Sequence, residues 1–358
     1  MAIQEVTKRL PEFEFDLFTA RLDQKLPSKE RIGNINVFRV GTGKPLMDKW
    51  LYPWRASKLA LDKHKISPYG AIHAIMATYA GLAALLFKKR QKNAPYLLTL
   101  QSGDSDFFIW LRTWFWYPWY RQIYTKANYI TAISRWLEDR ARSYGYKEEI
   151  SRIPNGVDVE SFSNKINLEE RKVIRDQWRV KDRDFVVITA SRLVRKNGID
   201  ILIDSINDLP ENVKLIIAGI GKDEKQLKSQ VASRKLQDRV LFLGHVGHER
   251  LPALLQSADV FVRPSRSEGM GNSFIEARIA GLPVLGTDIG GIKDLIKANI
   301  VEPIEVNEAE HVAKKIKEVM DKLNYSIQNP QNDVKDNFSW DSIAKQYKKV
   351  YESILVDS

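Results

Sequence analysis

The stretch from Ser265 to Gly291, SRSEGMGNSFIEARIAGLPVLGTDIGG, decides how the rest of the chain is organised. The apolar run Val260 to Val262 precedes it and predicts a strand, and Pro283 to Gly286 predicts a second one. Between them lie a Gly-rich turn and a short helix, Ser273 to Ala280. A Gly-rich turn at a helix amino end offers unpaired backbone N–H groups and a positive dipole end to an anion. The stretch therefore predicts a strand–turn–helix–strand unit with an anion site at its turn.

Two glutamates, Glu268 and Glu276, flank this turn. An ionised carboxylate only accepts hydrogen bonds, and sugars are rich in O–H donors, so the pair is suited to hydroxyl recognition. On these residues alone, an ordinary strand–turn–helix unit with both glutamates in solvent is the simpler interpretation.

A longer pattern of fixed spacings is a more specific signal than the glycines alone. It reads S-x-x-E-G-x-G, followed by a second E and A-x-x-x-G-x-P-V-x-x-T-x-x-G-G. It resembles the donor-site motif of the retaining glycosyltransferases of family 4 (GT4), which have the GT-B fold. The matching residues are Ser265, Glu268, Gly269, Gly271, Glu276, Ala277, Gly281, Pro283, Val284, Thr287, Gly290 and Gly291. The resemblance covers nearly the whole chain and implies an α/β protein with two Rossmann-like domains that face each other across a cleft.

The resemblance also implies roles for individual residues. In S-R-L-V-R-K-N-G, residues 191–198, Arg192 and Lys196 would bind the donor's diphosphate and stabilise the negative charge that grows as the glycosidic bond breaks. Glu268 would bind the hydroxyls of the donor sugar and Glu276 those of the ribose. A solvated basic turn is the alternative for the two cations.

Further donor-binding residues follow from the same resemblance. The backbone of Gly269, Met270, Gly271 and Asn272, with Ser273, would meet the sugar and phosphate, and Gly244 would border the base. At the end of the strand Tyr96 to Gly103, family members commonly carry a His where this chain has Gln101. The amide of Gln101 can hydrogen-bond a hydroxyl group of the donor, but unlike His it cannot become positively charged or transfer a proton. The resemblance implies no metal and no cofactor, and the nucleotide sugar is the co-substrate.

Composition sets wider bounds. The 358 residues suit two domains, and the absence of cysteine excludes disulfides and fits a reducing cytosol. No secretory signal is visible at the amino terminus. The segment Gly70 to Phe87 lacks charged residues, and we interpret it as a buried strand, Ala71 to Ile75, that leads into an apolar helix ending at Lys88-Lys89-Arg90.

Positive charge and tryptophan concentrate in the first half of the chain. The net charge is +11, and residues 156–358 contribute none of it because their acidic and basic side chains balance. Basic and aromatic surface suits an anionic membrane face or nucleic acid, and no nucleic-acid motif accompanies it. We therefore expect a cytoplasmic protein, peripheral on the inner face of the plasma membrane, with no nucleic-acid partner.

The segment 107–124, FFIWLRTWFWYPWYRQIY, concentrates this aromatic character. One interpretation is a helix packed on the core with a kink at Pro118. The other is an interfacial belt, in which Trp and Tyr enter the headgroup layer and Arg112 and Arg121 contact anionic lipid. Aromatic residues surround the helix axis, and both interpretations stay open.

The chain begins with a predicted helix, Ala2 to Leu10, and then short strands, with a loop-like region from Gly41 to Lys65. Doubly wound domains open instead on a central strand. The sequence thus resembles a family member entered at its first helix, through a misassigned start codon or a truncation, with an incomplete amino-terminal domain. We place domains at residues 1–158 (acceptor side) and 159–337 (donor side), and a helix at 338–358 that crosses back to the first domain.

The resulting hypothesis is a retaining hexosyltransferase of cell-envelope polysaccharide biosynthesis. It would move a sugar from a nucleotide diphosphate sugar to a lipid-linked or glycan acceptor. The alternative is a non-catalytic protein, derived from such an enzyme, that binds nucleotide sugars or docks on a membrane, since a fold does not guarantee an activity.

Overall fold

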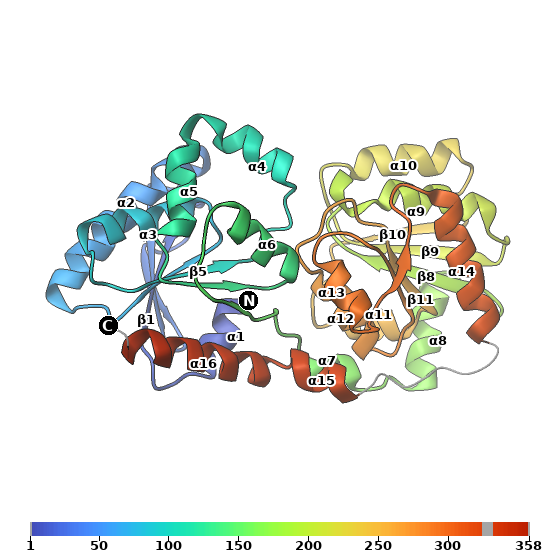
Figure 1. Ribbon diagram of the computed structural model, residues 1–358. Coiled ribbons are helices and arrows are strands. Elements are labelled where there is room, and N and C mark those ends of the chain that lie inside the picture. The colour runs from blue at the N-terminus through green and yellow to red at the C-terminus, as the bar shows by residue number, and fades with distance from the viewer. Residues whose placement is uncertain (1, 324–331, 357–358) are drawn as a thin grey trace. The chain divides into compact units, whose positions relative to one another are not determined.

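The computed structural model describes residues 2–323 and 332–356 (Figure 1). The chain divides into two compact units. The first comprises Met1–Gly156 together with Trp340–Ser358, and the second comprises Val157–Ser339. Each unit has its own parallel strands and its own hydrophobic core.

The second unit is built on one six-stranded sheet in which every pair of neighbours is parallel. The strand order is β10-β9-β8-β11-β12-β13. The four inner strands β8, β9, β11 and β12 are almost entirely buried, as expected of continuous apolar runs covered on both faces, whereas the edge strands β10 and β13 are more exposed. Their bounds are β8 Phe185–Ala190, β9 Val213–Ala218, β10 Val240–Gly244, β11 Val260–Arg263, β12 Val284–Thr287 and β13 Glu302–Ile304.

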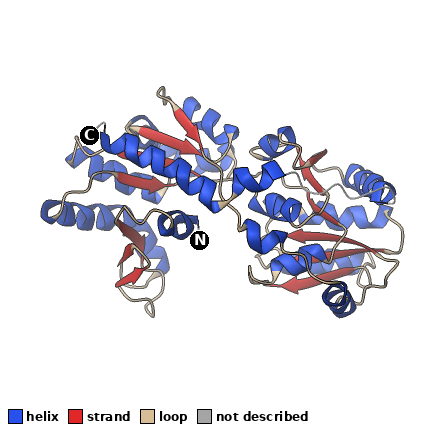
Figure 2. Ribbon diagram, turned by 90° about the horizontal axis from the view of Figure 1, so that it is seen from below, coloured by secondary structure: helices blue, strands red, loops and turns tan. Residues whose placement is uncertain are grey.

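Helices lie on both faces of this sheet (Figure 2). On one face, α9, α10 and α14 pack in a single apolar cluster with the strands. On the other, α7, α8, α11 and α12 contact one another, and Phe274 of α12 packs edge-on against Phe261 of β11. The bounds are α7 Val159–Ser163, α8 Leu168–Gln177, η2 Arg195–Asn197, α9 Ile199–Ser205, η3 Ile206–Asp208, α10 Glu224–Ser233, α11 Leu251–Gln256, α12 Asn272–Ile279, α13 Ile292–Lys297, α14 Ala309–Leu323 and α15 Asn332–Phe338.

The strands of the first unit form two separate sheets (Figure 2). One has the order β1-β3-β2, with β1 parallel and β2 antiparallel to β3. The other has the order β4-β5-β6-β7 and is parallel throughout. The bounds are β1 Phe15–Ala20, β2 Lys29–Ile32, β3 Ile35–Val40, β4 Ile72–Ile75, β5 Tyr96–Leu100, β6 Tyr129–Ala132 and β7 Ile150–Arg152.

In the first unit, a helix near the start of the chain packs against the last helix. The carboxyl-terminal α16 packs on α1, and Trp340, Ile343 and Tyr347 of α16 share a core with Val6 and Leu10. The bounds are α1 Ala2–Lys8, α2 Pro45–Ile66, α3 Tyr79–Arg90, α4 Asp106–Thr113, η1 Trp114–Trp116, α5 Tyr117–Thr125, α6 Arg135–Ser143 and α16 Trp340–Val356. In the described part of the chain, no helix combines the length and apolarity needed to cross a bilayer.

The loop expected from Gly41 to Lys65 is wrong, because most of this region is the long helix α2. Pro45 occupies the first turn, where proline is well tolerated, whereas Pro53 lies inside the helix and removes one backbone donor. The buried carboxylate of Asp48 accepts hydrogen bonds from the backbone N–H groups of Thr42, Gly43 and Lys44 and so ties the preceding turn to the helix. Contacts with α3 supply the stability that local propensity lacks.

The kink expected at Pro118 inside one helix is also wrong. Pro118 lies in the first turn of α5, after α4 has ended and the single turn η1 has intervened. The missing N–H of proline costs nothing at that position. The segment 107–124 is therefore three short helical elements.

Candidate active site

Because all strands of the second unit are parallel, the loops that follow them meet at one edge of the sheet. The predicted donor residues of this unit lie in the loops after β8 and β11, at the last residue of β10 and in α12. Close backbone contacts join these loops to one another. The fold therefore brings these residues, which are distant in sequence, to one edge of the sheet.

The loop after β8 carries Arg192 and Lys196. The Arg192 side chain is exposed, and Lys196 is half-buried. Buried Asn197 donates from Nδ2 to the Arg192 carbonyl oxygen at 2.7 Å and so fixes the turn between the two cations. Gly198 ends the turn with φ of +70°, a left-handed conformation that favours glycine.

This loop is joined to the loop after β11. The Lys196 carbonyl oxygen accepts a hydrogen bond from the N–H of Arg266 at 2.7 Å. A Cβ at Gly198 would lie 1.8 Å from the carbonyl oxygen of Pro264, so only glycine permits this approach. The cation-bearing loop and the Glu268 loop therefore hold a fixed spacing.

An ion pair strengthens the same junction. Arg266 donates to both carboxylate oxygens of Asp200, each at 2.8 Å, and to the carbonyl oxygen of Arg195. Partial burial by itself would raise the pKa of Asp200, but the hydrogen bond and charge of Arg266 outweigh it and hold that pKa below its usual value. The pair is bidentate, which adds geometric definition to the attraction.

Glu268 forms an ion pair with a buried arginine. Arg263, at the end of β11, is 5% exposed, and its Nη2 lies 2.5 Å from Oε2 of Glu268. The other carboxylate oxygen, Oε1, accepts from the N–H of Gly269 at 2.9 Å. Arg263 also donates from Nε to Ser265 Oγ and from Nη1 to Ser273 Oγ, and its guanidinium lies over the Phe274 ring.

This arrangement sets the charge of the turn. Burial lowers the pKa of Arg263, and the carboxylates of Glu268 and Glu276 oppose that effect. The guanidinium neutralises Glu268 locally while both carboxylate oxygens keep a defined direction. Because Arg263 neutralises the charge of Glu268, this carboxylate repels an anionic ligand less than an unpaired carboxylate would.

Glu276 lies on α12, is 8% exposed and has a partner of its own. Its Oε1 lies 3.3 Å from Nε2 of His248, whose ring also packs edge-on against Phe162. The hydrogen bond to Glu276 raises the pKa of His248. Gly271 caps α12 with φ of +88° and offers no side chain to the first turn, and the neighbouring Met270 is buried.

The remaining edge is formed by glycines. The Gly244 carbonyl oxygen accepts from the N–H of Gly219 at 2.7 Å, and Gly244 has φ of +70°. A Cβ on Gly219 would lie 1.9 Å from the Ser191 carbonyl oxygen, and one on Gly221 would lie 2.1 Å from that of Leu193. The loops after β8, β9 and β10 therefore pack backbone against backbone.

Gln101 belongs to the first unit, at the carboxyl end of β5. Its Nε2 donates to Oδ1 of Asn155 at 3.2 Å. It also takes part in the polar surroundings of the buried Tyr347 hydroxyl, whose pKa burial raises. All other predicted site residues lie in the second unit.

Sequence reasoning missed Arg263 and His248. Arg263 interrupts the apolar run V-F-V-R, and a charge at the end of a buried strand is a signal that could have identified it. His248 lies in a polar loop between β10 and α11, and no local pattern connects it to Glu276. Among the described residues, no group of three or more His, Asp or Glu side chains is placed to hold a metal ion.

Two protein families match the chain, one in each half. Glycosyltransferase family 4 matches residues 2–161, and glycosyl transferases group 1 matches residues 170–333. Mannosylfructose-phosphate synthase of Agrobacterium fabrum is 35% identical over 328 residues, which is 81% of this chain and 71% of that protein. The phosphatidylinositol N-acetylglucosaminyltransferase gpi3 subunit of Schizosaccharomyces pombe is 26% identical over 65% of this chain and 50% of its own length.

Solved structures agree on the fold. Sucrose-phosphate synthase from Thermosynechococcus elongatus superposes with a TM-score of 0.86 at 21% identity, over 99% of this chain and 93% of that one. Anabaena Alr3699/HepE, solved in complex with UDP and glucose, gives a TM-score of 0.78 at 21% identity, over 98% of this chain and 95% of its own. Taken with the sequence matches, these likenesses identify the chain as a GT-B glycosyltransferase that belongs to the glycosyl transferases group 1 family.

Proposed function

We propose that the protein transfers a sugar from a nucleoside diphosphate sugar to a lipid-linked or glycan acceptor of the cell envelope, with retention of the anomeric configuration. One observation supports this above others. The backbone contacts of Gly198 and Lys196 fix a loop with two cations against the loop that carries Glu268 and leads into the helix of Glu276, at the carboxyl edge of a parallel sheet. Cations suit a diphosphate, and carboxylates suit sugar hydroxyls.

The proposed reaction assigns the cations to the leaving group. The bond from the anomeric carbon to the diphosphate oxygen breaks, and the electron pair passes to that oxygen, where Arg192 and Lys196 stabilise the charge. The acceptor hydroxyl attacks the same face of the sugar and gives its proton to the departing phosphate oxygen. No side chain of the site then needs to act as a nucleophile.

The glutamates would position the donor. Glu268 and Glu276 accept from hydroxyl groups, of the sugar and the ribose respectively, with the Gly269–Ser273 turn at the sugar and phosphate and Gly244 beside the base. The Anabaena protein was solved with UDP and glucose, which makes a uridine donor the first to test here. The charge of the diphosphate is balanced by side chains in this proposal, without a metal.

A thermal-shift screen tests the donor assignment. GDP-, UDP- and ADP-sugars are added separately to the full chain, and a donor that binds only the folded state raises the unfolding midpoint. Transfer and donor hydrolysis are then measured with the donor that shifts most. If none of the three nucleotides shifts the midpoint, the donor assignment fails.

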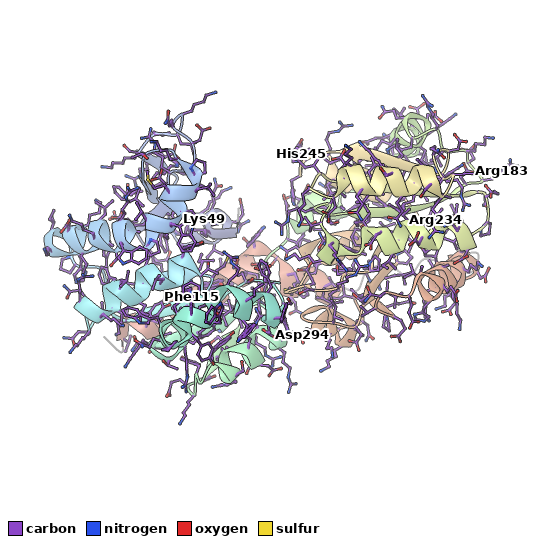
Figure 3. The ribbon with its side chains drawn as sticks, turned by 90° about the horizontal axis from the view of Figure 1, so that it is seen from above. Lys49, Phe115, Arg183, Arg234, His245 and Asp294 are labelled. Atoms are coloured by element: carbon purple, nitrogen blue, oxygen red, sulfur yellow. The ribbon has the colours of Figure 1, made fainter. Side chains whose placement is uncertain are left out.

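Substitution of the cations tests their role. Arg192→Ala and Lys196→Ala should each lower turnover by about 10²-fold or more, by analogy with loss of one donor from an oxyanion site. Arg183→Ala is the matched control, because Arg183 is exposed at the opposite, amino end of β8 (Figure 3). A loss below about threefold in both site variants would contradict the role.

A membrane surface is the proposed location of the acceptor. The aromatic segment, residues 107–124, exposes Phe107 by 71%, Trp114 by 61% and Phe115 by 61%, and Phe115 is labelled in Figure 3. Tyr120 and Tyr124 at its end are buried, so the segment is core at one end and exposed at the other. Isolated exposed apolar residues are common, whereas a run of this kind marks an interaction surface.

Basic side chains accompany these rings and favour anionic lipid as the partner. Lys89 lies 3.8 Å from the ring centroid of Trp119, and exposed Arg112 lies over Phe108. Trp at the headgroup layer with adjacent Lys and Arg suits the inner face of a plasma membrane. A lipid-linked acceptor is further supported by the Schizosaccharomyces pombe relative, which is named as part of a phosphatidylinositol N-acetylglucosaminyltransferase.

Vesicle co-sedimentation tests this surface. The double variant Trp114→Ala/Phe115→Ala should lose most of its binding to vesicles that contain anionic lipid, and wild-type binding should fall with salt. Leu168→Ala, which alters an 86% exposed leucine in the second unit, is the matched control. Equal binding by the double variant and the control would remove the membrane proposal.

The alternative function is nucleotide-sugar binding without transfer. The division of the first unit into two sheets is the observation that favours it, because the acceptor would be held there. Donor binding in the thermal-shift screen, with neither transfer nor Arg192-dependent hydrolysis, would support this alternative over the enzyme.

A further inference from the structure

The carboxylate proposed to bind the ribose, Glu276, is paired with His248, which has no part in the proposed reaction. Nε2 of His248 lies 3.3 Å from Oε1 of Glu276. The side chain of Glu276 is 11% exposed, and that of His248 is 37% exposed. A carboxylate with so little access to water needs a partner inside the protein, and a bond to that partner fixes the direction of its remaining lone pairs.

A buried aromatic side chain fixes the ring of His248 in turn. His248 lies in the loop between β10 and α11 and packs edge-on against Phe162 of α7, with ring centroids 5.2 Å apart. Phe162 is fully buried, and α7 contacts α12, the helix that carries Glu276. The ring therefore lies between two elements that also contact each other, with Nε2 directed at the carboxylate.

Acidic side chains lie around this ring. The hydrogen bond to Glu276 contributes most to raising the pKa of His248, and the charges of Asp158, at the amino end of α7, and of Glu249, in the same loop, act in the same direction. Partial burial opposes them. Since an ordinary histidine has a pKa near 6.5, the ring of His248 is charged in slightly acidic solution and loses its charge above that value.

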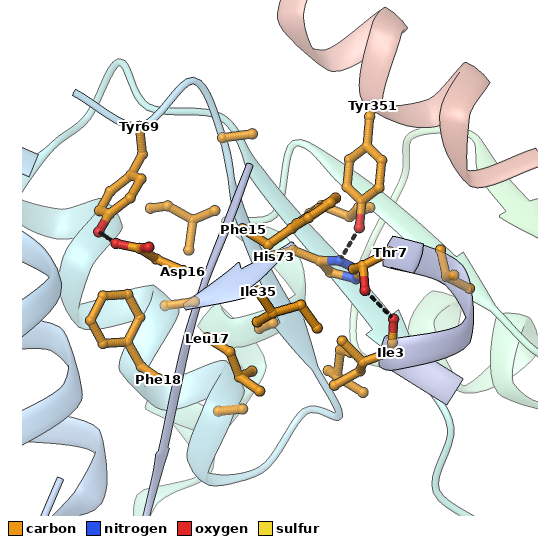
Figure 4. A pocket seen from close by; sticks show the side chains of 18 of the residues that line it. Ile3, Thr7, Phe15, Asp16, Leu17, Phe18, Ile35, Tyr69, His73 and Tyr351 are labelled. Atoms are coloured by element: carbon orange, nitrogen blue, oxygen red, sulfur yellow. Dashed lines mark hydrogen bonds between the residues drawn. The ribbon is translucent and has the colours of Figure 1, made fainter. Parts of the chain in front are cut away.

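A histidine of the first unit has the opposite environment. Nδ1 of His73 lies 2.9 Å from the hydroxyl oxygen of Tyr351, as Figure 4 shows, and Nε2 lies 2.6 Å from that of Thr99. Burial lowers the pKa of His73 to about 4, so this ring is neutral around pH 7. Hydroxyl partners thus leave a buried ring neutral, whereas the carboxylate beside His248 favours the charged form.

Such a pair suits a carboxylate that receives a diol. One bond from His248 to Oε1 leaves the second acceptor position of Oε1 and both positions of Oε2 for hydroxyl groups. A side chain that is already held loses less freedom when a ligand binds, which is worth a factor of about two to ten in affinity. A charged donor forms the stronger hydrogen bond and so holds the carboxylate more firmly than a neutral one.

We propose that His248 is a positioning residue for the donor, which fixes the Glu276 carboxylate for the ribose hydroxyls and does so best when its ring is charged. This role rests on the proposed function, because it requires Glu276 to be the ribose contact. His248 would act through Glu276 and not on the reacting atoms.

Calorimetric titration of the full chain tests this role with UDP, GDP and ADP, each beside its 2′,3′-dideoxy analogue, which lacks the ribose hydroxyls. His248→Leu should weaken binding of the nucleotide that the wild type binds by about two- to tenfold, with no matching loss for the dideoxy form. The matched control, His311→Gln, should bind as the wild type does. His311 lies on α14, which packs on the opposite face of the sheet from α12.

The pH dependence is measured with His248→Gln, which keeps an N–H donor but cannot become charged. The ratio of its dissociation constant to that of the wild type should fall from about threefold at about pH 6 to about one at about pH 8.5, because the charged bond of the wild type is lost over this range. The terminal phosphate of the nucleotide also titrates near pH 6, but it is common to both proteins and cancels in the ratio.

Three results would overturn the role of His248. Either His248→Leu binds the nucleotide as the wild type does, or its loss is equal for the dideoxy form, or the ratio for His248→Gln is the same at every pH. If His248→Leu fails to fold, the ratio for His248→Gln decides by itself. A wild type that binds none of the three nucleotides would reject the donor site itself, and the role of His248 with it.

Discussion

Because Arg263 is more deeply buried than Glu268, removing either partner of their ion pair should change the stability of the second unit by a different amount. The side chain of Arg263 is 6% exposed and that of Glu268 is 19% exposed. In Glu268→Ala the guanidinium stays buried and loses its only counter-charge at hydrogen-bond distance among the described residues, with Ser265 and Ser273 as remaining acceptors. Breaking a buried pair in this way costs about 3–5 kcal/mol of unfolding free energy.

The opposite substitution should cost less. In Arg263→Leu the carboxylate of Glu268 keeps the N–H of Gly269 and its solvent-exposed side, so we expect a loss of about 1–3 kcal/mol. The double variant should be more stable than Glu268→Ala alone, because no uncompensated charge remains buried. This order is the reverse of what residue size alone predicts.

Calorimetry of the full chain measures the effect, with hydrogen exchange of β11 as the local readout. For a unit the size of Val157–Ser339, a change of 1 kcal/mol moves the midpoint by roughly 2–4 °C, so Glu268→Ala should lower it by roughly 6–20 °C. A loss below about 1 kcal/mol, or a larger loss for Arg263→Leu than for Glu268→Ala, would refute the reasoning.

Two further predictions concern the same unit. Gly198→Ala should destabilise it by about 2 kcal/mol more than Gly244→Ala, because both glycines have φ of +70° but only the first has a carbonyl oxygen where the Cβ would lie; equal midpoints in calorimetry would contradict this. Glu276 raises the pKa of His248, so the pair stabilises the fold fully below the unfolded value near 6.5 and loses that contribution as pH rises through the folded pKa. The midpoint difference between wild type and His248→Gln should therefore shrink from about pH 6 to about pH 8.5, and a difference independent of pH would exclude the charged pair.

The sequence alone predicted the strands β11 and β12, the Gly-rich turn after β11 and the short helix α12. These elements follow from local patterns, namely continuous apolar runs for buried strands and glycines where the backbone turns. The spacing of Glu268, Glu276 and the glycines also identified the family before any contact was known. Such features are readable because each depends on residues close together in the chain.

The tertiary structure decided what depends on distant partners. α2 forms against its local signals because it packs on α3, and Arg263 remains charged in a core because Glu268 folds back over it. The aromatic segment divides into an exposed and a buried part according to what lies beside it, which periodicity does not encode. His248 meets Glu276 for the same reason, because the packing of α7 and α12 brings together residues far apart in sequence.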